Sequence, residues 1–554
     1  MTTATETETF DYVIVGGGSA ASVLTERLTA GSTATVCVLE AGPLDRSIYF
    51  QIPAGFFKTF RNPKFTWGLK SEPSPGTNGR QIDLVQGKVF GGSGSINGLV
   101  YNRGQADDFN HWAQLGNKGW SYDDILPYFK RTERRVGDGD NAYRGREGGI
   151  VVSDLAWHNP LCEAFLDGAA ELGLKRNPDY NGAYQEGVGY LQRFINKGRR
   201  SAAGQVFLRP AMQRPNVEVR CGAHVTKLLF AGKRAVGVRY QNDRNAPPRE
   251  MRARREVILS AGATSSPKLL QISGVGPASL LSELGIPVVH ELPGVGENFQ
   301  DHYAARVVAR VQGVNTINQY ARPPRLWWEV AKWAAGQSSV LDLQPSLMYG
   351  FWKSTPGLEN PDIQFISSPG SYKPGKVYVL DDFPAMTCGF FQQRPLSTGY
   401  IRAASSDPFQ LPRAQPNYLA EREDQRVLIA GFRMARRLLA SKALSRYFVA
   451  EQLPGKDVVS DDELLDFGRR TGTTIFHMVG TCKMGPGTDR MAVVDPELRV
   501  HGVEGLRVVD ASVMPTVVSA NTYAATLMIA ERASDLIKGV PAAAAPQRRT
   551  NHAA

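Results

Sequence analysis

Residues 11–21 read Asp11-Tyr12-Val13-Ile14-Val15-Gly16-Gly17-Gly18-Ser19-Ala20-Ala21, and they set the architecture of the chain around them. A short β-branched run stops at three glycines and passes into a helical pattern with apolar Val23, Leu24 and Leu28. A second strand-like run, residues 36–39, ends at Glu40, 24 residues beyond the first glycine. The pattern therefore predicts a strand, a tight turn, a helix and a parallel strand, which together make one βαβ unit.

The glycines of this unit match the pattern G-x-G-x-x-G/A through Gly16, Gly18 and Ala21. The first glycine makes the turn, the second lets the backbone approach a pyrophosphate, and the third position packs the helix on the sheet. The helix N-terminus offers N–H groups to the diphosphate, and Glu40 can accept hydrogen bonds from ribose hydroxyls. A dinucleotide site, for FAD or NAD, is favoured over a purely structural turn.

The composition is that of a globular enzyme with a sizeable core. At about 150 residues per domain, 554 residues favour two large, interleaved domains. Hydrophobic residues at 42% and charged residues at 21% exclude a disordered or fibrous chain. The net charge of +11 is compatible with nucleic acid, an anionic membrane surface or simple solubility. Solubility is favoured, and nucleic-acid binding is not expected, because the basic runs are short and scattered.

The cysteines and the N-terminus carry no special signal. Five cysteines without a C-x-x-C or a metal-ligand spacing imply neither a disulfide framework nor a metal site. The first ten residues lack a basic and an apolar region, and the chain has no stretch of 18 apolar residues. We therefore expect no secretory leader and no transmembrane segment, with a cytoplasmic location as the default.

Further along, the texture of the chain changes twice. Residues 42–104 have Pro/Gly punctuation and little periodicity, which indicates a long functional or cofactor-covering loop. From residue 312 to 469 many prolines and a tryptophan cluster indicate a second domain. Strands are expected at 217–219, 236–238, 256–260 and 506–509, and helices after Gly262 and over residues 522–537.

Five segments then occur in an order typical of one family: the early glycine motif, the loop 87–101, the segment 262–276, the segment 293–298, and a closing region with His477 and Asn521. Together they resemble the glucose-methanol-choline (GMC) oxidoreductases over nearly the whole chain. The texture is most similar to bacterial choline dehydrogenase-like and sorbose dehydrogenase-like alcohol dehydrogenases.

The resemblance implies an α/β fold in which a Rossmann-like FAD-binding domain is interleaved with an α+β substrate-binding domain of sheet and helices. The FAD-binding domain is expected at residues 1–155, 205–311 and 470–540. The substrate-binding domain is expected at residues 156–204 and 312–469. Residues 541–554 are Ala/Pro-rich and are expected to form a disordered tail.

The resemblance also implies FAD and the residues that bind it. These match family positions for the diphosphate (Gly16, Gly18, Ser19, Ala20), the adenosine ribose (Glu40), the adenine (Trp67, Val225, Ala261), the flavin ring (Gly92, Asn97, Val100) and the ribityl-phosphate end (Asp510, Ala511), with Ala41, Gly87, Gly98 and Thr522 completing the set. Ala21 replaces a more usual glycine, and Phe90 a smaller aliphatic residue. Ile96 stands where some members attach the flavin through a histidine, so FAD is expected to be non-covalent.

The implied reaction is oxidation of an alcohol to the aldehyde or ketone, with hydride transfer to flavin N5. Such a reaction needs a base with a pKa near neutrality above the ring. Among eight histidines, His477 matches the family's catalytic position, although Met478 replaces a common proline beside it. Asn521 would orient the substrate oxygen and stabilise an alkoxide-like transition state. The residue at position 521 or 522 is also expected to cap the helix that follows.

Several alternatives stay open at this stage. A protein that keeps FAD inert, or a non-redox lyase on the same FAD-containing fold, would share these motifs. The expected partners are a small-molecule alcohol and an electron acceptor, which could be quinone-like, a dye or oxygen. The sequence does not decide the alcohol, the acceptor, oxidase against dehydrogenase, or the oligomeric state. Trp327, Trp328, Trp333 and Phe476 hint at an aromatic-lined pocket, but core or lid packing is the more usual role of a tryptophan cluster.

Overall fold

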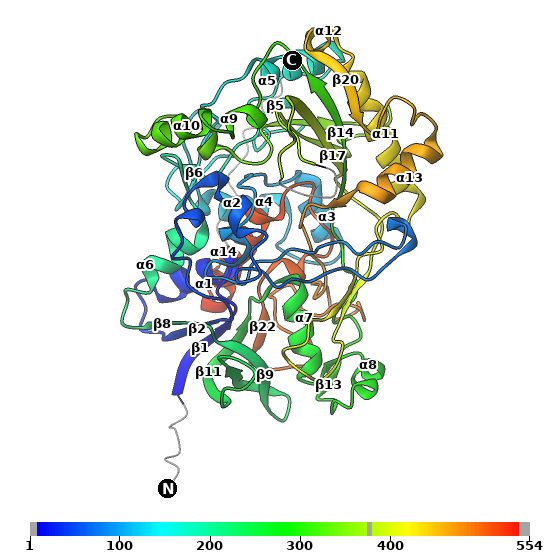
Figure 1. Ribbon diagram of the computed structural model, residues 1–554. Helices are drawn as coiled ribbons and strands as arrows, with labels where there is room; N and C mark the ends of the chain where they lie inside the picture. Colours follow the sequence, from blue (N-terminus) through cyan, green and yellow to red (C-terminus); the bar gives the residue numbers. More distant parts are fainter. Residues whose placement is uncertain (1–7, 374–378, 542–554) are drawn as a thin grey trace, which may run out of the picture.

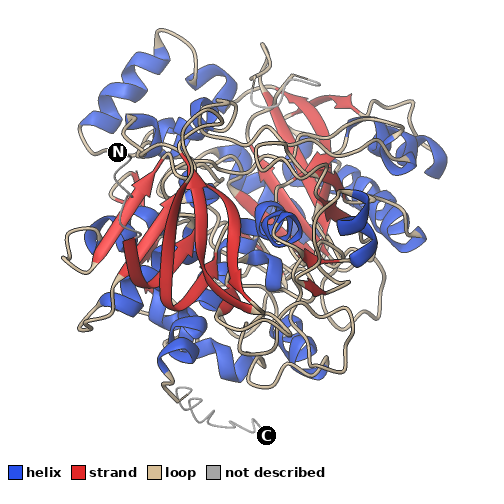
Figure 2. Cartoon of the chain, turned by 90° about the horizontal axis from the view of Figure 1, so that it is seen from below, coloured by secondary structure: helices blue, strands red, loops and turns tan. Residues whose placement is uncertain are grey.

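Two seven-stranded sheets frame the molecule in the computed structural model, which describes residues 8–373 and 379–541. Figure 1 shows the first sheet in the lower half of the view and the second in the upper half, and Figure 2 shows both in red with helices around them. The expected α/β class with two interleaved units is confirmed.

The first sheet has the order β8-β2-β1-β11-β10-β9, with β22 beside β11. Its strands are β1 (Glu8–Val15), β2 (Val36–Glu40), β8 (Val217–Cys221), β9 (His224–Ala231), β10 (Arg234–Gln241), β11 (Arg249–Leu259) and β22 (Leu506–Val508). Strand β1 pairs in parallel with both β2 and β11, and β22 pairs in parallel with β11. Since all five residues of β2 are buried, its continuous apolar run suits a parallel sheet covered on both faces.

The carboxyl ends of these parallel strands meet at one edge of the sheet, which is where open α/β sheets bind ligands. Helix α1 (Ser19–Thr29) leaves from this edge after β1, and α14 (Thr522–Lys538) packs beside it. The buried Glu531 of α14 accepts from Arg27 of α1 at 2.8 Å and from Arg131 of α4 (Tyr122–Thr132) at 2.6 Å. A buried carboxylate requires such partners, and these fix the three helices against one another.

The second sheet has the order β20-β14-β17-β16-β15-β5, with β21 beside β14, and its pairs are antiparallel. Its strands are β5 (Gly187–Tyr190), β14 (Tyr303–Val311), β15 (Met348–Trp352), β16 (Ile363–Ser368), β17 (Ala385–Gln392), β20 (Phe448–Leu453) and β21 (Thr473–Thr474). Helix α11 (Arg422–Leu439) packs on β14 and β17 and contacts α5 (Pro160–Glu171) and α13 (Asp461–Thr471).

Shorter elements complete the chain. The helices are α2 (Phe56–Thr59), α3 (Ala106–Gln114), α6 (Arg209–Ala211), α7 (Gly262–Ile272), α8 (Ala278–Glu283), α9 (Ile317–Tyr320), α10 (Arg325–Ala334) and α12 (Lys442–Ser445). The strands are β3 (Glu133–Arg135), β4 (Ile150–Val152), β6 (Ile195–Asn196), β7 (Arg199–Arg200), β12 (Val275–Gly276), β13 (His290–Glu291), β18 (Tyr400–Arg402) and β19 (Arg413–Gln415). Short helical turns include η1 (Ile48–Phe50), η2 (Pro53–Gly55), η4 (Gly92–Ser95), η6 (Val340–Asp342) and η7 (Ala511–Val513).

The expected strands near 217, 236, 256 and 506 correspond to β8, β10, β11 and β22, and the expected helices to α7 and α14. Strand β14 lies in the range expected for the FAD-binding domain, yet it is a central strand of the second sheet. A division by sheets therefore assigns residues 303–311 to the second unit. The expected tail lies, except for Pro541, outside the described residues.

Candidate active site

The glycine turn after β1 closes tightly against β11. Gly16 has φ +94°, and a Cβ built on it would lie 2.6 Å from the carbonyl oxygen of Ser260. Its N–H donates to the carbonyl of Leu39 at 2.8 Å. Both the left-handed conformation and the close approach require glycine here. The same turn brings Ala261 against Gly16, since Ala261 Cα would be 3.0 Å from that Cβ.

Gly18 is a glycine for a different reason. It has φ −79°, a conformation open to any residue, and a Cβ on it would have its nearest protein atoms at 3.9 Å. The second glycine loop nevertheless runs close by, because Gly91 donates to the carbonyl of Gly17 at 2.9 Å and a Cβ on Gly92 would lie 2.8 Å from Gly18 Cα. The protein thus leaves room at Gly18, in front of the first turn of α1, where no side chain caps the helix. This cradle fits a diphosphate.

Glu40 closes the neighbouring strand with a buried carboxylate. Its Oε2 accepts from the N–H of Gly17 and its Oε1 from the N–H of Gly42, each at 2.7 Å. Burial raises the pKa of Glu40 to about 7, against the lowering effect of these two bonds and of the Lys88 charge. Lys88 also lies 4.9 Å from the ring centroid of Trp67, and Trp67 packs edge-on against His224 at 5.6 Å. The structure therefore brings Trp67 beside the start of β9, which carries Val225.

Asp510 follows β22 and ties two turns together. Its Oδ2 accepts from the N–H of Gly262 at 2.8 Å and from the hydroxyl of Ser266 at 2.6 Å, while its Oδ1 accepts from Ser512. The carboxylate fixes the start of α7 to η7. Ala511, the first residue of η7, is thereby held beside the carboxyl end of the sheet.

The other expected cofactor residues of the glycine loop are Gly87, Asn97, Gly98 and Val100. Asn97 is held by Arg200, which donates to its Oδ1 at 2.7 Å and to its carbonyl at 2.8 Å. Two further glycines of the loop are crowded. A Cβ built on Gly87 would lie 2.5 Å from the carbonyl carbon of Gly92, and one built on Gly98 would lie 2.9 Å from the ring of Pro345. Val100 follows this loop and packs in a small apolar cluster with Tyr180, Leu191, Tyr349 and Phe351.

The two expected catalytic residues meet. The amide Nδ2 of Asn521 lies 3.0 Å from Nε2 of His477. Asn521 occupies the N-cap position of α14, but its side chain makes no capping hydrogen bond, so the expectation that it caps the helix is wrong. Its Oδ1 is buried and has no hydrogen-bond partner. A buried acceptor without a partner points to a donor that arrives with a ligand, such as a substrate hydroxyl.

A second histidine, His302, stands behind His477. Their Nδ1 atoms are 2.8 Å apart, and Nε2 of His302 lies 2.8 Å from the carbonyl oxygen of Gln393. A carbonyl only accepts, so His302 carries its proton on Nε2 and accepts at Nδ1. His477 must then donate from Nδ1, which leaves a lone pair on its Nε2 facing the Asn521 amide. The hydrogen bonds run in one direction and assign the tautomer of each ring.

Both rings are neutral at neutral pH. Burial lowers the pKa of His302 to about 4 and holds that of His477 well below its usual 6.5, with His302 as a second lowering influence. A neutral His477 whose unprotonated Nε2 faces only the Asn521 amide among its hydrogen-bond partners has the form of a general base.

Asp301 holds the backbone of both histidines. Its Oδ1 accepts from the N–H of His302 at 2.9 Å and of His477 at 2.8 Å, and its Oδ2 accepts from Tyr418 and Thr474. Burial raises its pKa to about 6. Phe476, beside His477, adopts φ +66°, an uncommon conformation for an aromatic residue that occurs where surroundings impose it.

Aromatic rings surround the pair, but not the tryptophans. The ring centroid of Phe391 lies 4.7 Å from that of His302 and 6.1 Å from that of His477, and Phe60 packs on Phe476 at 4.8 Å. Trp327 and Trp328 are each 68% exposed, so the expectation of core packing is wrong for them. Trp333 is partly buried and donates from Nε1 to Gly198.

Sequence reasoning missed His302, Asp301 and Gln393. A signal existed, since Gln300-Asp301-His302 follows directly on the segment 293–298 that carried the resemblance. The pairing itself was not visible, because 175 residues separate the two histidines.

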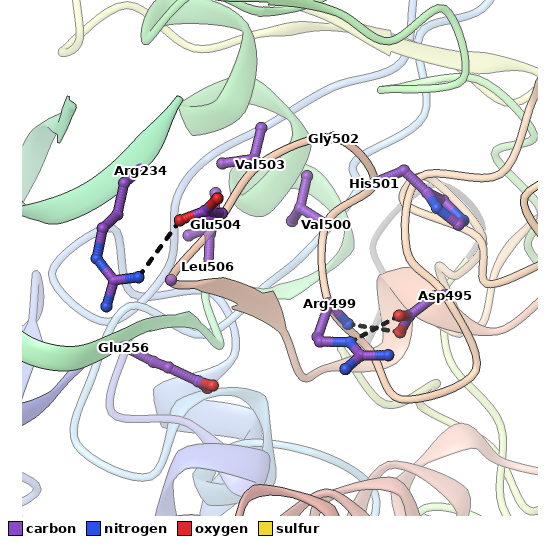
Figure 3. A pocket seen from close by; sticks show the side chains of 11 residues that line it. Arg234, Glu256, Asp495, Arg499, Val500, His501, Gly502, Val503, Glu504 and Leu506 are labelled. Atoms are coloured by element: carbon purple, nitrogen blue, oxygen red, sulfur yellow. Dashed lines mark hydrogen bonds and ion pairs between the residues drawn. The ribbon is translucent and has the colours of Figure 1, made fainter. Parts of the chain in front are cut away.

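A separate open pocket of about 440 Å³ lies at the loop 499–506, away from this cluster (Figure 3). Its charged residues are occupied with one another: Arg499 pairs with Asp495 at 2.7 Å and Arg234 with Glu504 at 3.5 Å. Within the described ranges no group of three potential ligands is arranged to hold a metal ion. Nor does any described helix combine the length and apolarity that a membrane span needs.

Two family models named GMC oxidoreductase match the chain, the N-terminal one over residues 10–304 and the C-terminal one over residues 395–530. The chain belongs to the GMC oxidoreductase family. Among its relatives is an oxygen-dependent choline dehydrogenase of Pseudomonas putida (strain GB-1), 41% identical over 541 residues, which cover 96% of this chain and 94% of the relative.

Two solved structures superimpose closely on this chain. Pyridoxine 4-oxidase from Mesorbium loti has a TM-score of 0.86 and 28% identity, over 96% of this chain and 100% of that chain. An FAD-dependent oxidoreductase from Chaetomium thermophilum has a TM-score of 0.86 and 27% identity, over 96% and 99%. This GMC oxidoreductase is therefore an FAD-dependent enzyme that acts on CH–OH donors.

Gly18→Ala should separate ligand binding from folding. The new methyl group meets nothing closer than 3.9 Å, so the free energy of unfolding of the FAD-free protein should change by less than about 1 kcal/mol. FAD retention should fall by about tenfold or more, because the methyl group occupies the diphosphate cradle. Gly16→Ala is the control: it should destabilise the fold by more than about 2 kcal/mol. Chemical denaturation and flavin absorbance measure the two effects, and full flavin retention in Gly18→Ala contradicts the assignment.

His302→Leu should slow flavin reduction by about 10- to 100-fold, because His477 Nδ1 loses the acceptor that fixes its tautomer. His302→Asn should recover much of the rate, since its amide oxygen can accept that proton. Losing His302 removes a lowering influence on the pKa of His477, so the acid limb of the rate profile should move to higher pH in His302→Leu. A rate loss with an unmoved acid limb indicates a structural role only.

Proposed function

We propose that this chain oxidises a small-molecule alcohol with FAD and that Nε2 of His477 takes the hydroxyl proton. The observation that carries the proposal is the one-way chain of hydrogen bonds from Asn521 through His477 and His302 to the Gln393 carbonyl. It leaves His477 Nε2 unprotonated beside the unpartnered Oδ1 of Asn521, while the lone pair of His302 Nδ1 is taken up by His477.

The residues proposed to hold FAD fit the group. The cradle at Gly18 would receive the diphosphate, with Gly16, Ser19 and Ala20 around it and Gly92 opposite. Glu40, with Ala41 beside it, would bind the ribose, and Trp67, Val225 and Ala261 would lie toward the adenine. Gly87, Asn97, Gly98, Val100, Asp510, Ala511 and Thr522 complete the proposed set. When bound, FAD supplies N5 as the acceptor of the hydride from the substrate carbon.

The chain's own residues manage the proton and the orientation of the substrate. The amide of Asn521 can donate to the substrate oxygen through Nδ2 or accept from its hydroxyl through Oδ1. The proton then passes to His477 Nε2, while Nδ1–H stays directed at His302. The buried aromatic surroundings exclude water, so that these polar contacts are stronger than in bulk solvent.

Choline is the first substrate to test, because relatives about 40% identical are named choline dehydrogenases. Phe60, Phe391 and Phe476 offer ring faces and edges near the base, which suits a quaternary ammonium group but also an aryl alcohol. Choline, polyols and aromatic alcohols should be compared, each with oxygen and with an artificial acceptor. The lyase alternative gains no specific support; cyanide release from a cyanohydrin without flavin reduction identifies it.

His477→Ala should retain FAD and a near-normal visible spectrum while anaerobic flavin reduction falls by about 10²- to 10⁴-fold. Asn521→Ala should lose less. Raising the pH should partly restore His477→Ala, because solvent then supplies alkoxide. His501→Ala, at the loop of the separate pocket, is the control and should match the wild type. Reduction of His477→Ala within a few-fold of wild type removes His477 from the mechanism.

FAD should be released into the supernatant on acid precipitation. Ile96 has no nucleophile, and its side chain is buried in a small apolar cluster with Phe50 and Val89. A yellow, flavin-containing pellet contradicts the non-covalent assignment.

A further inference from the structure

Helix α10 is amphipathic with its apolar side outward. At 100° per residue, Trp327, Trp328, Val330, Ala331 and Ala334 fall on one arc of the helix. All of them are exposed, Trp327 and Trp328 to 68% and Val330 to 44%. The residue of this helix that is buried is Glu329, at 2% exposure. The helix thus reverses the usual arrangement of a surface helix.

Two anchors hold this orientation. Glu329 accepts from the N–H of Val340 at 2.9 Å and pairs with Lys332 at 2.5 Å, while Ser339 donates to the Glu329 carbonyl. On the same inner side, Trp333 donates from Nε1 to Gly198 at 3.0 Å. These contacts fix the rotation of α10 about its axis, so the outward face is built into the fold.

The surroundings of this face are basic. Helix α10 contacts η6, η6 contacts η2, and Arg199 of the neighbouring hairpin lies 5.2 Å from the ring centroid of Trp333. The segments that meet here are 46–64, 193–200 and 315–342. Their exposed Lys and Arg side chains number seven: Arg46, Lys58, Arg61, Lys64, Lys197, Arg199 and Arg325. Arg193 and Arg200 are buried, as are the two acidic residues of these segments, Glu329 and Asp342. Arg322 is offset by a pairing with Asp382. Figure 1 shows α10 beside α9 and β6 at the periphery of the second unit.

We propose that this face, the α10 face, docks on the surface of an anionic lipid bilayer. Tryptophan is favoured at the level of the lipid headgroups, because its apolar ring contacts the acyl chains while its indole N–H stays hydrogen-bonded to water or headgroups. Nearby cationic side chains are attracted to anionic headgroups. Helix α10 has ten residues, which suits a position in the plane of the interface.

A second copy of the chain is a poorer occupant. At 68% exposure, the two tryptophans offer roughly 300 Å² between them. A stable protein interface takes about 800 Å² from each partner. The basic surroundings would also be opposed by their own copy across a two-fold axis, whereas an anionic surface complements them.

The FAD-loaded enzyme should be sedimented with vesicles of phosphatidylcholine alone and of an equal mixture with phosphatidylglycerol. Binding should be stronger to the anionic vesicles and should weaken in about 1 M salt, where the Debye length falls to about 3 Å. Trp327→Ser combined with Trp328→Ser should lower the partition coefficient by about tenfold or more. Tryptophan fluorescence should shift to the blue on binding in the wild type and much less in this double variant.

Tyr184→Ser combined with Leu396→Ser is the matched control, since these side chains are 66% and 59% exposed elsewhere. It should bind vesicles as the wild type does. Flavin content and activity toward a soluble alcohol report that each variant is folded. Equal vesicle binding by the tryptophan variant, or no preference for anionic lipid, overturns the proposal. A wild-type dimer that becomes a monomer in the tryptophan variant overturns it too and assigns the face to a contact between copies.

Discussion

The hydrogen bond between His302 and His477 is the contact on which the site depends. His302 directly precedes β14, and Gln393, whose carbonyl accepts a hydrogen bond from His302 Nε2–H, directly follows β17, so both come from the second sheet. Asn521 comes from the start of α14, which packs against α1 of the first unit. The proposed base, His477, is therefore oriented only when the two units are docked. A shift of either unit would break a chain in which each donor has one available acceptor.

The need to hold the two units in one fixed arrangement also explains the architecture near the cradle at Gly18. Ser19 begins α1 and Tyr523 belongs to the first turn of α14, and both approach Gly94 of the glycine loop. The carboxylate of Glu531, on α14, binds Arg27 of α1 and Arg131 of α4. These ion pairs hold α14 in place along α1, so the first turns of the two helices stay side by side. The cradle at Gly18 and the amide of Asn521 are thus parts of one rigid assembly, which is what a reaction between a bound cofactor and a positioned substrate requires.

The sequence predicted those elements that neighbouring residues specify by themselves, and it missed those that depend on tertiary contacts. The βαβ unit followed from residues 11–40, because a β-branched run, glycines and a helical period specify it without distant partners. His477 and Asn521 were found through a resemblance, and the structure brings them together. His302 and Asp301 were missed because their roles arise from tertiary contact and not from spacing. The orientation of α10 was missed for a similar reason: its pattern is amphipathic either way, and buried Glu329 decides which face turns outward.

The partner of His477 Nδ1 decides how readily the His477 ring becomes charged. A carboxylate in that place would favour the charged ring and raise its pKa. Here the nearby carboxylate, Asp301, is occupied by backbone N–H groups and hydroxyls, and the neutral imidazole of His302 accepts the hydrogen bond from His477 Nδ1–H. Burial and His302 both lower the pKa of His477, so the ring is unprotonated at neutral pH. Once protonated, the ring has no ion pair among the described residues that would stabilise its charge. In the proposed reaction, such a base would take the hydroxyl proton only as hydride loss makes that proton acidic, and it would release the proton readily afterwards. For that reaction, the buried chain of neutral rings favours repeated turnover over tight binding of the proton.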